Sequence, residues 1–313
     1  MAPEEDSDPL ADFPIARSPP RLLRFFSPKG LSLLTRGHLR LTPPNEFNDP
    51  FEFCAAIPTT LPLEVDRMRW LRDANGFLYA SHKQNHSDDY ETWAALALKQ
   101  GMDFWSAMLR NLCLNYAKAV SHAYGVCCFM ELADREFTDP EIVHFWDRYA
   151  AGHHGFAVEF NPRAHLFDRY RKERWLFPVS YKREDQRSVI DPDKLTTDCN
   201  SMLRYLRKIA AEKFETWKSE HEWRLIAPLK ESEDFPITML ERSGKSYFFL
   251  DLSRIKKKKV PFEAIASVYL GCRACKLKEC VLAACSEPRL AHVSVFQAKP
   301  SDHDFTFSYK RLK

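Results

Sequence analysis

The feature that most limits the fold of this chain is the irregular order of its candidate helices and strands. Apolar residues recur at three- and four-residue steps in two long segments, 61–75 and 88–124, which predicts amphipathic helices with a break at Gly101. A third helix is expected at 194–217, and short apolar runs predict strands at 21–26, 39–41, 125–130, 156–160, 176–181, 222–228, 246–252, 266–270, 292–296 and 305–309. Because these segments show no regular strand–helix–strand rhythm, an α+β fold with mixed or antiparallel sheets of short strands is favoured.

The expected domain organisation is simple. Residues 1–18 are rich in Pro and Asp, which predicts a disordered tail. Residues 19–313 are expected to form a single α+β domain with a helical insert at about 61–124. With 45% hydrophobic and 28% charged residues, the composition is that of a soluble globular protein with a sizeable core.

Charge and cysteine usage exclude several classes of protein. A formal net charge of +3 gives no general case for a nucleic-acid partner or a membrane surface, and no apolar run approaches the ~20 residues of a bilayer span. The first 20 residues lack the apolar core of a signal peptide, so a cytoplasmic protein with its nine cysteines as thiols is expected. The spacing of Cys272, Cys275, Cys280 and Cys285 lacks a second C-x-x-C pair, so no metal site is predicted.

The segment Phe47 to Glu52, with sequence FNDPFE, sets an Asn, an Asp and a Glu between two aromatic residues and around Pro50. Asn and Asp before Pro turn the backbone, so a fixed corner is expected here. Asn48 and Asp49 then have two interpretations. Either their side chains bond their own backbone, as is usual in a turn, or they face a cleft.

A second group of polar residues lies at 217–224. If this segment is a strand, Glu220, Glu222 and Arg224 project from one face, while Trp223 and Leu225 point to the core. Two carboxylates on one face are suited to a sugar diol or a divalent cation. The alternative is a solvated edge face with an ordinary Glu–Arg pair.

A third group follows helical spacing. Trp146, Tyr149 and His153 stand at positions i, i+3 and i+7, which puts them on one stripe if the helix continues to His153. Such a stripe is either a ligand platform or part of the core, since buried Trp and Tyr keep polar tips that need partners.

Four blocks of residues carry a resemblance to a known family. They are 23–41 with FNDPFE, then 127–129 with WDRYA at 146–150, His153 and 155–160, then 179–181, and finally Lys213 with 217–226, 265–271 and 293–298. Together they resemble the bacterial family called domain of unknown function 2971. The chain departs from the family at Phe25-Phe26, where a Tyr is usual, and at Ala151-Gly152, where Asp-Asn is common. The resemblance implies a shared fold and no particular reaction.

The leading hypothesis is an ADP-ribosyltransferase-like enzyme that consumes NAD. The order of a basic residue on the first strand, a central aromatic and His element, and a late Glu-x-Glu strand is similar to that of such transferases. Glu222 would hold a ribose hydroxyl and stabilise an oxocarbenium-like state, Glu220 would orient the acceptor, and Arg24 would bind pyrophosphate. The catalytic set is Glu222, Glu220, Tyr149 and His153, and the NAD-binding set is Arg24, Asn48, Asp49, Trp146 and Arg224, with Tyr149 or Trp146 stacking on nicotinamide.

Two alternatives remain at this stage. A metal-dependent nuclease or phosphodiesterase would gather Asp49, Glu220 and Glu222 around Mg²⁺. A non-catalytic ligand-sensing or interaction protein of a defence or stress system would bind a ligand, such as a small nucleotide, without turnover. The sequence leaves the acceptor open, whether nucleic acid or protein.

Overall fold

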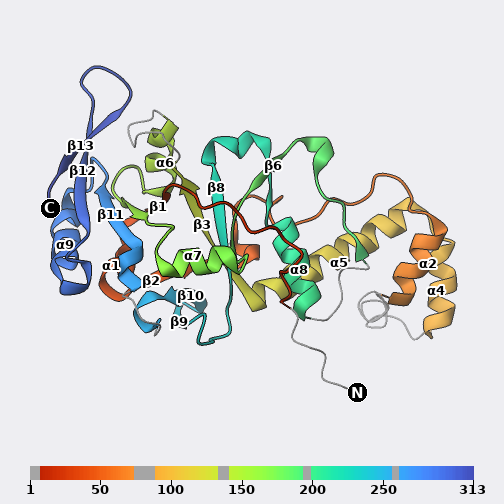
Figure 1. Cartoon of the computed structure of the whole chain (residues 1–313). Helices are drawn as coiled ribbons and strands as arrows, with labels where there is room; N and C mark the ends of the chain where they lie inside the picture. Colours follow the sequence, from red (N-terminus) through yellow and green to blue (C-terminus); the bar gives the residue numbers. More distant parts are fainter. Residues whose placement is uncertain (1–7, 74–88, 133–140, 193–198, 256–260) are drawn as a thin grey trace. The chain divides into compact units, whose positions relative to one another are not determined.

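A computed structural model describes residues 8–73, 89–132, 141–192, 199–255 and 261–313. Its contacts divide the chain into two compact units. We call the first the helical unit, which consists of Met1–Phe13, Pro43–Tyr124 and Ser180–Glu215, and the second the sheet unit, which consists of Pro14–Thr42, Gly125–Val179 and Thr216–Lys313. Both are coloured along the sequence in Figure 1. The expected insert at about 61–124 is therefore only part of a larger unit that also includes 180–215.

The sheet unit is built on an eight-stranded sheet with strand order β13-β12-β11-β4-β1-β3-β8-β5. Its strands are β1 Leu22–Phe26, β3 Tyr124–Glu131, β4 Phe156–Phe160, β5 Leu176–Pro178, β8 Glu222–Pro228, β11 Ile265–Leu270, β12 Ser294–Pro300 and β13 Phe307–Arg311. Strand β11 pairs in parallel with β12 and antiparallel with β4, so the sheet is mixed. A second, antiparallel sheet joins β2 His38–Leu41, β10 Lys245–Asp251 and β9 Ile237–Arg242. The α+β class expected from the sequence is confirmed.

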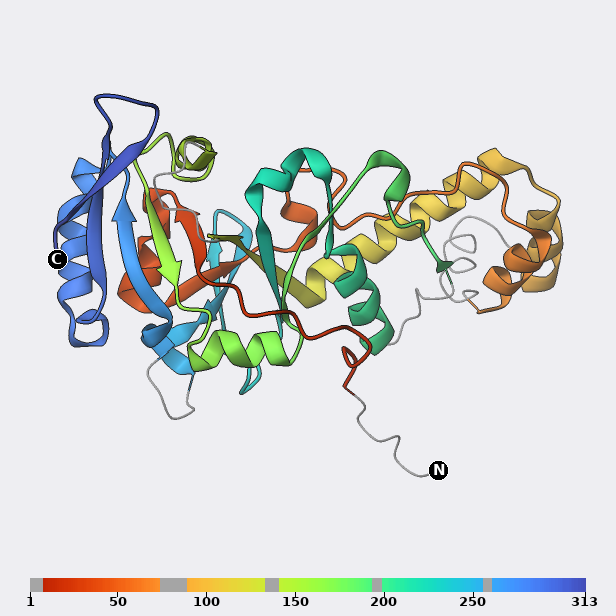
Figure 2. The same cartoon turned by 45° about the horizontal axis from the view of Figure 1, so that its top comes forward.

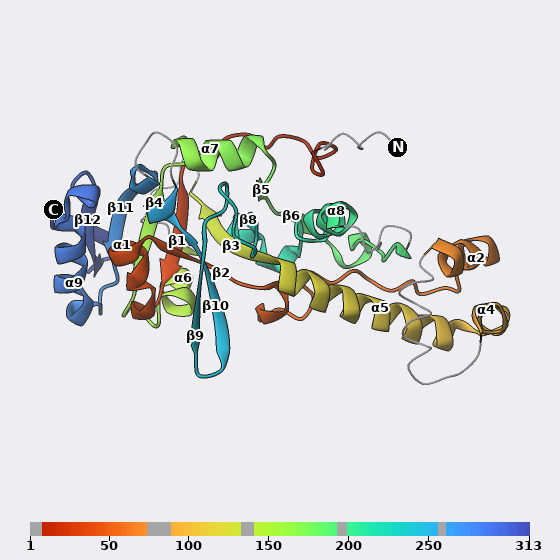
Figure 3. The ribbon, with the colours of Figure 1, turned by 90° about the horizontal axis from the view of Figure 1, so that it is seen from below.

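Two core clusters lie on opposite faces of the large sheet. The helices of this unit are α1 Ser32–Arg36, α6 Glu141–Tyr149, α7 His165–Lys172 and α9 Cys275–Ser286. Phe156 and Val158 of β4 join the cluster that contains residues of α1, α7 and α9, whereas the intervening Ala157 joins the cluster of α6. Alternate side chains of a strand point to opposite faces. Accordingly, α7 and α6 lie on opposite sides of the strands in Figure 3.

The helical unit consists of α2 Glu64–Asp73, α4 Tyr90–Leu98, α5 Met102–Ala123 and α8 Cys199–Ile209, with a small parallel sheet of β6 Ser180–Lys182 and β7 Glu212–Phe214. The break expected at Gly101 is confirmed, because Gly101 is the N-cap of α5. One face of α5 is buried, as the expected periodicity requires, through Trp105, Leu109, Leu112, Tyr116 and Val120. Figure 2 shows α5 as the long helix of this unit.

Two expected elements were wrong. The helix expected at 194–217 ends at Ile209, and the chain then enters β7, because pairing with β6 outweighs the helix propensity of this segment. Residues 193–198 lie outside the described ranges. The strand expected at 176–181 is two strands, of which β5 pairs with β8 in the sheet unit and β6 pairs with β7 in the helical unit.

The segment expected to be a disordered tail has ordered contacts from residue 8 onward. In the helical unit Leu10 is buried and Pro9 accepts a hydrogen bond from Arg204. In the sheet unit Arg17 donates to the carboxylate of Glu131. Residues 1–7 are outside the described part of the chain.

The sheet unit contains a close backbone approach that only glycine permits. A Cβ atom at Gly155 would lie 2.0 Å from the carbonyl oxygen of Phe26. We expect Gly155→Ala to lower the free energy of unfolding by about 1–3 kcal/mol, since a backbone atom must move to admit the methyl group. Gly101→Ala is the control, because its Cβ meets no atom within 4 Å, and its cost should stay below about 1 kcal/mol in urea unfolding. Equal losses in the two variants would contradict the steric explanation.

Candidate functional site

The expected corner at residues 47–52 is present in the helical unit. The amide of Phe51 donates to the Asp49 carboxylate at 2.9 Å, and the amide of Glu52 donates to the Asp49 carbonyl at 3.2 Å. Pro50 occupies the second position of this turn, which its fixed φ favours. The Asp49 side chain therefore bonds its own backbone, as in the first interpretation, and the residue also lines a pocket.

The corner ends in a strained residue. Phe53 has a φ of 57°, in the left-handed region that a bulky residue rarely adopts, at a typical cost of about 1–3 kcal/mol. Its ring is buried and packs edge-on against Phe47, with 4.6 Å between the centroids. This packing stabilises the left-handed backbone conformation of Phe53, which lies between Glu52 and Cys54.

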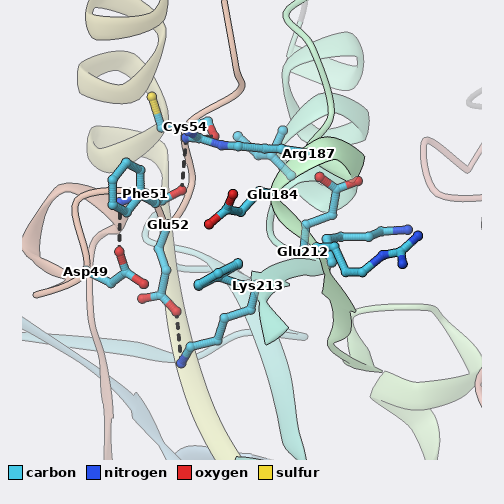
Figure 4. A pocket seen from close by; sticks show the side chains of 12 residues that line it. Asp49, Phe51, Glu52, Cys54, Glu184, Arg187, Glu212 and Lys213 are labelled. Atoms are coloured by element: carbon cyan, nitrogen blue, oxygen red, sulfur yellow. Dashed lines mark hydrogen bonds and ion pairs between the residues drawn. The ribbon is translucent and has the colours of Figure 1, made fainter. Parts of the chain in front are cut away.

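A pocket of about 290 Å³ lies beside the corner, entirely within the helical unit. Its walls come from the corner, from the segment that follows β6, and from β7. The lining residues are Asp49, Phe51, Glu52, Cys54, Lys182, Arg183, Glu184, Arg187, Ile209, Glu212, Lys213 and Phe214. Figure 4 shows the corner and β7 on opposite sides, with the Glu184 carboxylate between them. The pocket combines aromatic, cationic and carboxylate side chains.

The corner is joined to β7 by a buried ion pair. The Lys213 ammonium lies 3.1 Å from the Glu52 carboxylate, and the two side chains are only 8% and 4% exposed (Figure 4). A buried charge that loses its partner is costly. This pair therefore fixes the last residue of the corner against the strand that forms the opposite wall.

Arg187 crosses the pocket from the other direction. Its guanidinium donates to the Cys54 carbonyl at 2.7 Å and to the Phe51 carbonyl at 3.3 Å, and lies 5.3 Å from the centre of the Phe51 ring. Because these carbonyl acceptors are neutral, they do not cancel the positive charge of Arg187, which lines the pocket. Glu212 accepts from the amide and the hydroxyl of Ser188, which fixes the carboxylate in the wall.

The same corner places Cys54 against Cys113 of α5. The two cysteines line the same small void, and the Cys54 thiol lies 3.8 Å from the Ala55 carbonyl. The pKa of Cys54 is lowered to about 6, first because the Cys113 thiol donates to its sulfur and also because Arg187 is close. The pKa of Cys113 is raised, because this thiol keeps the proton of the hydrogen bond and is buried.

Of the sequence-predicted site residues, Tyr149 and Glu220 meet in the sheet unit. The Tyr149 hydroxyl donates to the Glu220 carboxylate at 2.6 Å, and Arg148 lies 3.9 Å from the same carboxylate. Arg148 also lies 4.9 Å from the ring centre of Trp217. Tyr149 is 38% exposed, so this cluster reaches solvent at the end of α6.

Glu222 and Arg224 share a face of β8, as expected. The Arg224 guanidinium donates to the Glu222 carboxylate at 2.7 Å. The solvated edge face is wrong, however, because both side chains are buried and Arg224 is 0% exposed. Strand β8 lies inside the sheet, with both edges paired to β3 and β5, and its side chains are buried on both faces from Glu222 to Ala227. Glu220 is not on the strand, because it ends a 3₁₀ turn and His221, with a φ of 43°, separates it from β8.

The expected stripe of Trp146, Tyr149 and His153 is also wrong, because α6 ends at Tyr149. His153 follows in a turn with a φ of 70°, and its ring packs against Phe307. Burial lowers the pKa of His153. Trp146 is fully buried and donates to the Tyr309 hydroxyl at 3.3 Å, so the core interpretation of its position is correct.

The remaining predicted residues lie apart from these. Arg24 of β1 donates to the sulfur of Cys127 and, at 3.3 Å, to the carbonyl of Cys128. Burial raises the pKa of the Cys127 thiol to about 11. Asn48 is exposed on the corner in the helical unit, next to the pocket-lining Asp49.

Sequence reasoning missed most of the pocket. Lys213 entered only as part of the family resemblance, and the other missed lining residues were Cys54, Lys182, Arg183, Glu184, Arg187, Ile209, Glu212 and Phe214. The available signal was the position of Cys54 two residues after FNDPFE. The contribution of 182–187 depends on a strand pairing between β6 and β7 that local pattern does not reveal.

Two negative findings apply to the described ranges. Within them, no group of three or more His, Cys, Asp or Glu residues is placed to hold a metal ion. No helix there is long and apolar enough to cross a membrane.

Comparison with known proteins gives a family and no activity. Residues 145–225 match the family model described as Protein of unknown function (DUF2971). No curated protein and no solved structure matches the chain. The matched residues include Tyr149, Lys213, Glu220 and Glu222, whereas the corner at 47–52 lies outside them. The match over residues 145–225 supports membership of the DUF2971 family of proteins of unknown function.

Proposed function

We propose that the helical unit binds a small nucleotide in the pocket beside the corner, as a ligand-sensing rather than a catalytic protein. The observation that carries this proposal is the composition of the pocket wall, in which exposed aromatic rings, cations and carboxylates surround one cavity of about 290 Å³. Ligand sites usually combine an apolar surface with a few convergent polar groups.

Each part of a nucleotide has a matching group in this wall. Phe51 and Phe214 are 65% and 39% exposed, so their rings are accessible to a base. Arg183, with a 62% exposed side chain, supplies a cation for a phosphate at the mouth of the pocket, and Arg187 supplies another deeper inside. The Glu184 carboxylate faces the cavity in Figure 4, where it would accept hydrogen bonds from ribose hydroxyls.

The size of the pocket favours a mononucleotide. A volume of about 290 Å³ is at the lower end of the range for small-molecule sites, roughly 300–1,000 Å³. A dinucleotide such as NAD would leave one half outside this cavity. A nucleoside monophosphate is therefore the preferred ligand class.

Transfer of ADP-ribose from NAD has less support. The carboxylate that stabilises an oxocarbenium-like state must reach the ribose. Glu222 is 5% exposed and is bound by the buried Arg224, so a substrate would have to displace this pair. Glu220, 7% exposed, is bonded to Tyr149. The alternative nuclease also lacks support, because the described residues form no carboxylate cluster suited to Mg²⁺.

Thermal unfolding with added AMP, GMP, adenosine, inorganic phosphate and NAD tests the proposal. We expect a monophosphate to raise Tm, since a ligand at 100 times its Kd adds about 2.7 kcal/mol to the free energy of unfolding. Phe51→Ala and Arg183→Ala should each weaken the shift without unfolding the protein, because both side chains are largely exposed. Lys208→Ala is the matched control, since Lys208 is an exposed cation of the same unit outside the pocket lining.

Three outcomes would contradict the proposal. The first is that none of the nucleotides changes Tm. The second is that a nucleotide shifts Tm equally in Phe51→Ala, in Arg183→Ala and in the control Lys208→Ala. The third is that the protein releases nicotinamide from NAD and loses this activity in Glu220→Gln or Glu222→Gln, which would support the ADP-ribosyltransferase hypothesis instead.

A further inference from the structure

Cys54 and Cys113 lie side by side beneath the pocket, although 58 residues separate them in the sequence. Cys54 follows the strained Phe53, and Cys113 lies near the middle of α5. Both line a small void with Tyr116 and Tyr205. In Figure 4 the Cys54 sulfur points away from the pocket centre, toward the helix.

The two sulfurs differ in access. Cys54 lines the 290 Å³ pocket as well as the inner void, whereas Cys113 lines the inner void and is not among the residues of the larger pocket. The larger pocket therefore has Cys54, and not Cys113, in its wall. Arg187, which bonds the Cys54 carbonyl, places a positive charge beside it and favours the thiolate.

We propose that Cys54 and Cys113 form a reversible redox pair, in which Cys54 reacts with a peroxide and Cys113 closes the disulfide. This proposal does not rest on nucleotide binding. It uses the void that both cysteines line, the position of Cys54 in the wall of the larger pocket and the adjacent guanidinium.

The chemistry is balanced with a hydroperoxide as the oxidant. The Cys54 thiolate attacks one peroxide oxygen, the O–O bond breaks, and the leaving hydroxide takes a proton to become water; Cys54 is now a sulfenic acid. The Cys113 sulfur attacks the Cys54 sulfur, the S–S bond forms, and the hydroxyl leaves as water with the Cys113 proton. The thiol pair has lost two electrons and two protons, and a small dithiol reverses the reaction.

The structural consequence follows from the position of the bond. A disulfide here would tie the end of the corner to α5. Phe53, with its φ of 57°, lies directly before the bond. The oxidised protein would therefore hold the corner covalently in the conformation that forms one wall of the pocket.

Hydrogen peroxide titration of the full chain, followed by alkylation, proteolysis and mass spectrometry, tests the proposal. We expect a peptide that links Cys54 to Cys113 to appear at the lowest peroxide concentration and to disappear after dithiothreitol. In Cys113→Ser, Cys54 should stop at the sulfenic acid, which dimedone traps. In Cys54→Ser, Cys113 should remain reduced at the same concentration.

Cys275 and Cys280 of α9 are the internal controls, because both are exposed. If exposure alone decided reactivity, these two would be oxidised before Cys54, and the proposal would be overturned. The absence of a Cys54–Cys113 peptide in the wild-type chain at any peroxide concentration would overturn it as well. Circular dichroism of both Ser variants checks that their folds are intact.

Discussion

Arg224→Met is expected to lower the free energy of unfolding by about 3–5 kcal/mol, the range measured when one partner of a buried ion pair is removed. Arg224 is 0% exposed and Glu222 is 5% exposed, with 2.7 Å between the guanidinium and the carboxylate. Met keeps much of the aliphatic volume and removes the charge. The Glu222 carboxylate would then lose the guanidinium that bonds it in the interior of the eight-stranded sheet.

Urea unfolding measures this loss, and amide hydrogen exchange shows whether it falls on β8 and its neighbours β3 and β5. The double variant Glu222→Gln with Arg224→Met should recover much of the loss, because it leaves no buried charge. Arg148→Met is the control for an exposed pair, since the Arg148 side chain is 54% exposed and lies 3.9 Å from Glu220; it should cost less than about 1 kcal/mol. A loss as small as that of Arg148→Met would show that the pair in β8 is not essential.

The Glu–Arg pair also illustrates what local pattern predicts well. Period-two alternation correctly put Glu222 and Arg224 on one face of a strand and Trp223 on the other. It did not predict burial, since charged residues usually indicate a solvated face. Strand β8 is paired on both edges, by β3 and β5, and is buried on both faces, and these are properties of long-range pairing and packing.

Elements with strong local signals were predicted well. The strand 156–160 matches β4, and the strand 222–228 matches β8, because short segments rich in apolar residues, with polar residues at alternate positions, leave few alternatives. The break at Gly101 was also predicted. The helix expected through residue 217 was wrong, since amphipathic periodicity in 199–209 gives no sign that β7 will pair with β6.

The candidate site was predicted in one part only. FNDPFE identified the corner, and its turn follows from Pro50 and the Asx bond of Asp49. The partners of the corner, Lys213 and Arg187, lie more than 130 residues away in the sequence, where composition gives no reason to connect them with it. The predicted set centred on Glu222 instead belongs to the sheet unit, where its best contacts stabilise the fold.

The second large effect is expected at this long-range contact. Lys213→Met should lower the free energy of unfolding by about 3–5 kcal/mol, because the Glu52 side chain, 4% exposed, would keep its charge without the ammonium 3.1 Å away. The loss should appear in the helical unit, as faster hydrogen exchange of β6 and β7. It should also weaken nucleotide binding, because Glu52 and Lys213 join opposite walls of the pocket.

Two variants separate the ion pair from simple loss of a lysine. Lys182→Met removes another lysine that lines the same pocket, and it should change the free energy of unfolding by about 0.5 kcal/mol or less. Glu52→Gln with Lys213→Met should recover part of the stability, since the remaining amide is neutral. If Lys213→Met were as mild as Lys182→Met, the corner would be held by its own turn and by Phe53 packing alone. If Lys213→Met instead caused a large loss of unfolding free energy that the double variant reversed, the buried ion pair would be what joins the two walls of the pocket. Its two residues, Glu52 and Lys213, are brought together only by the tertiary fold.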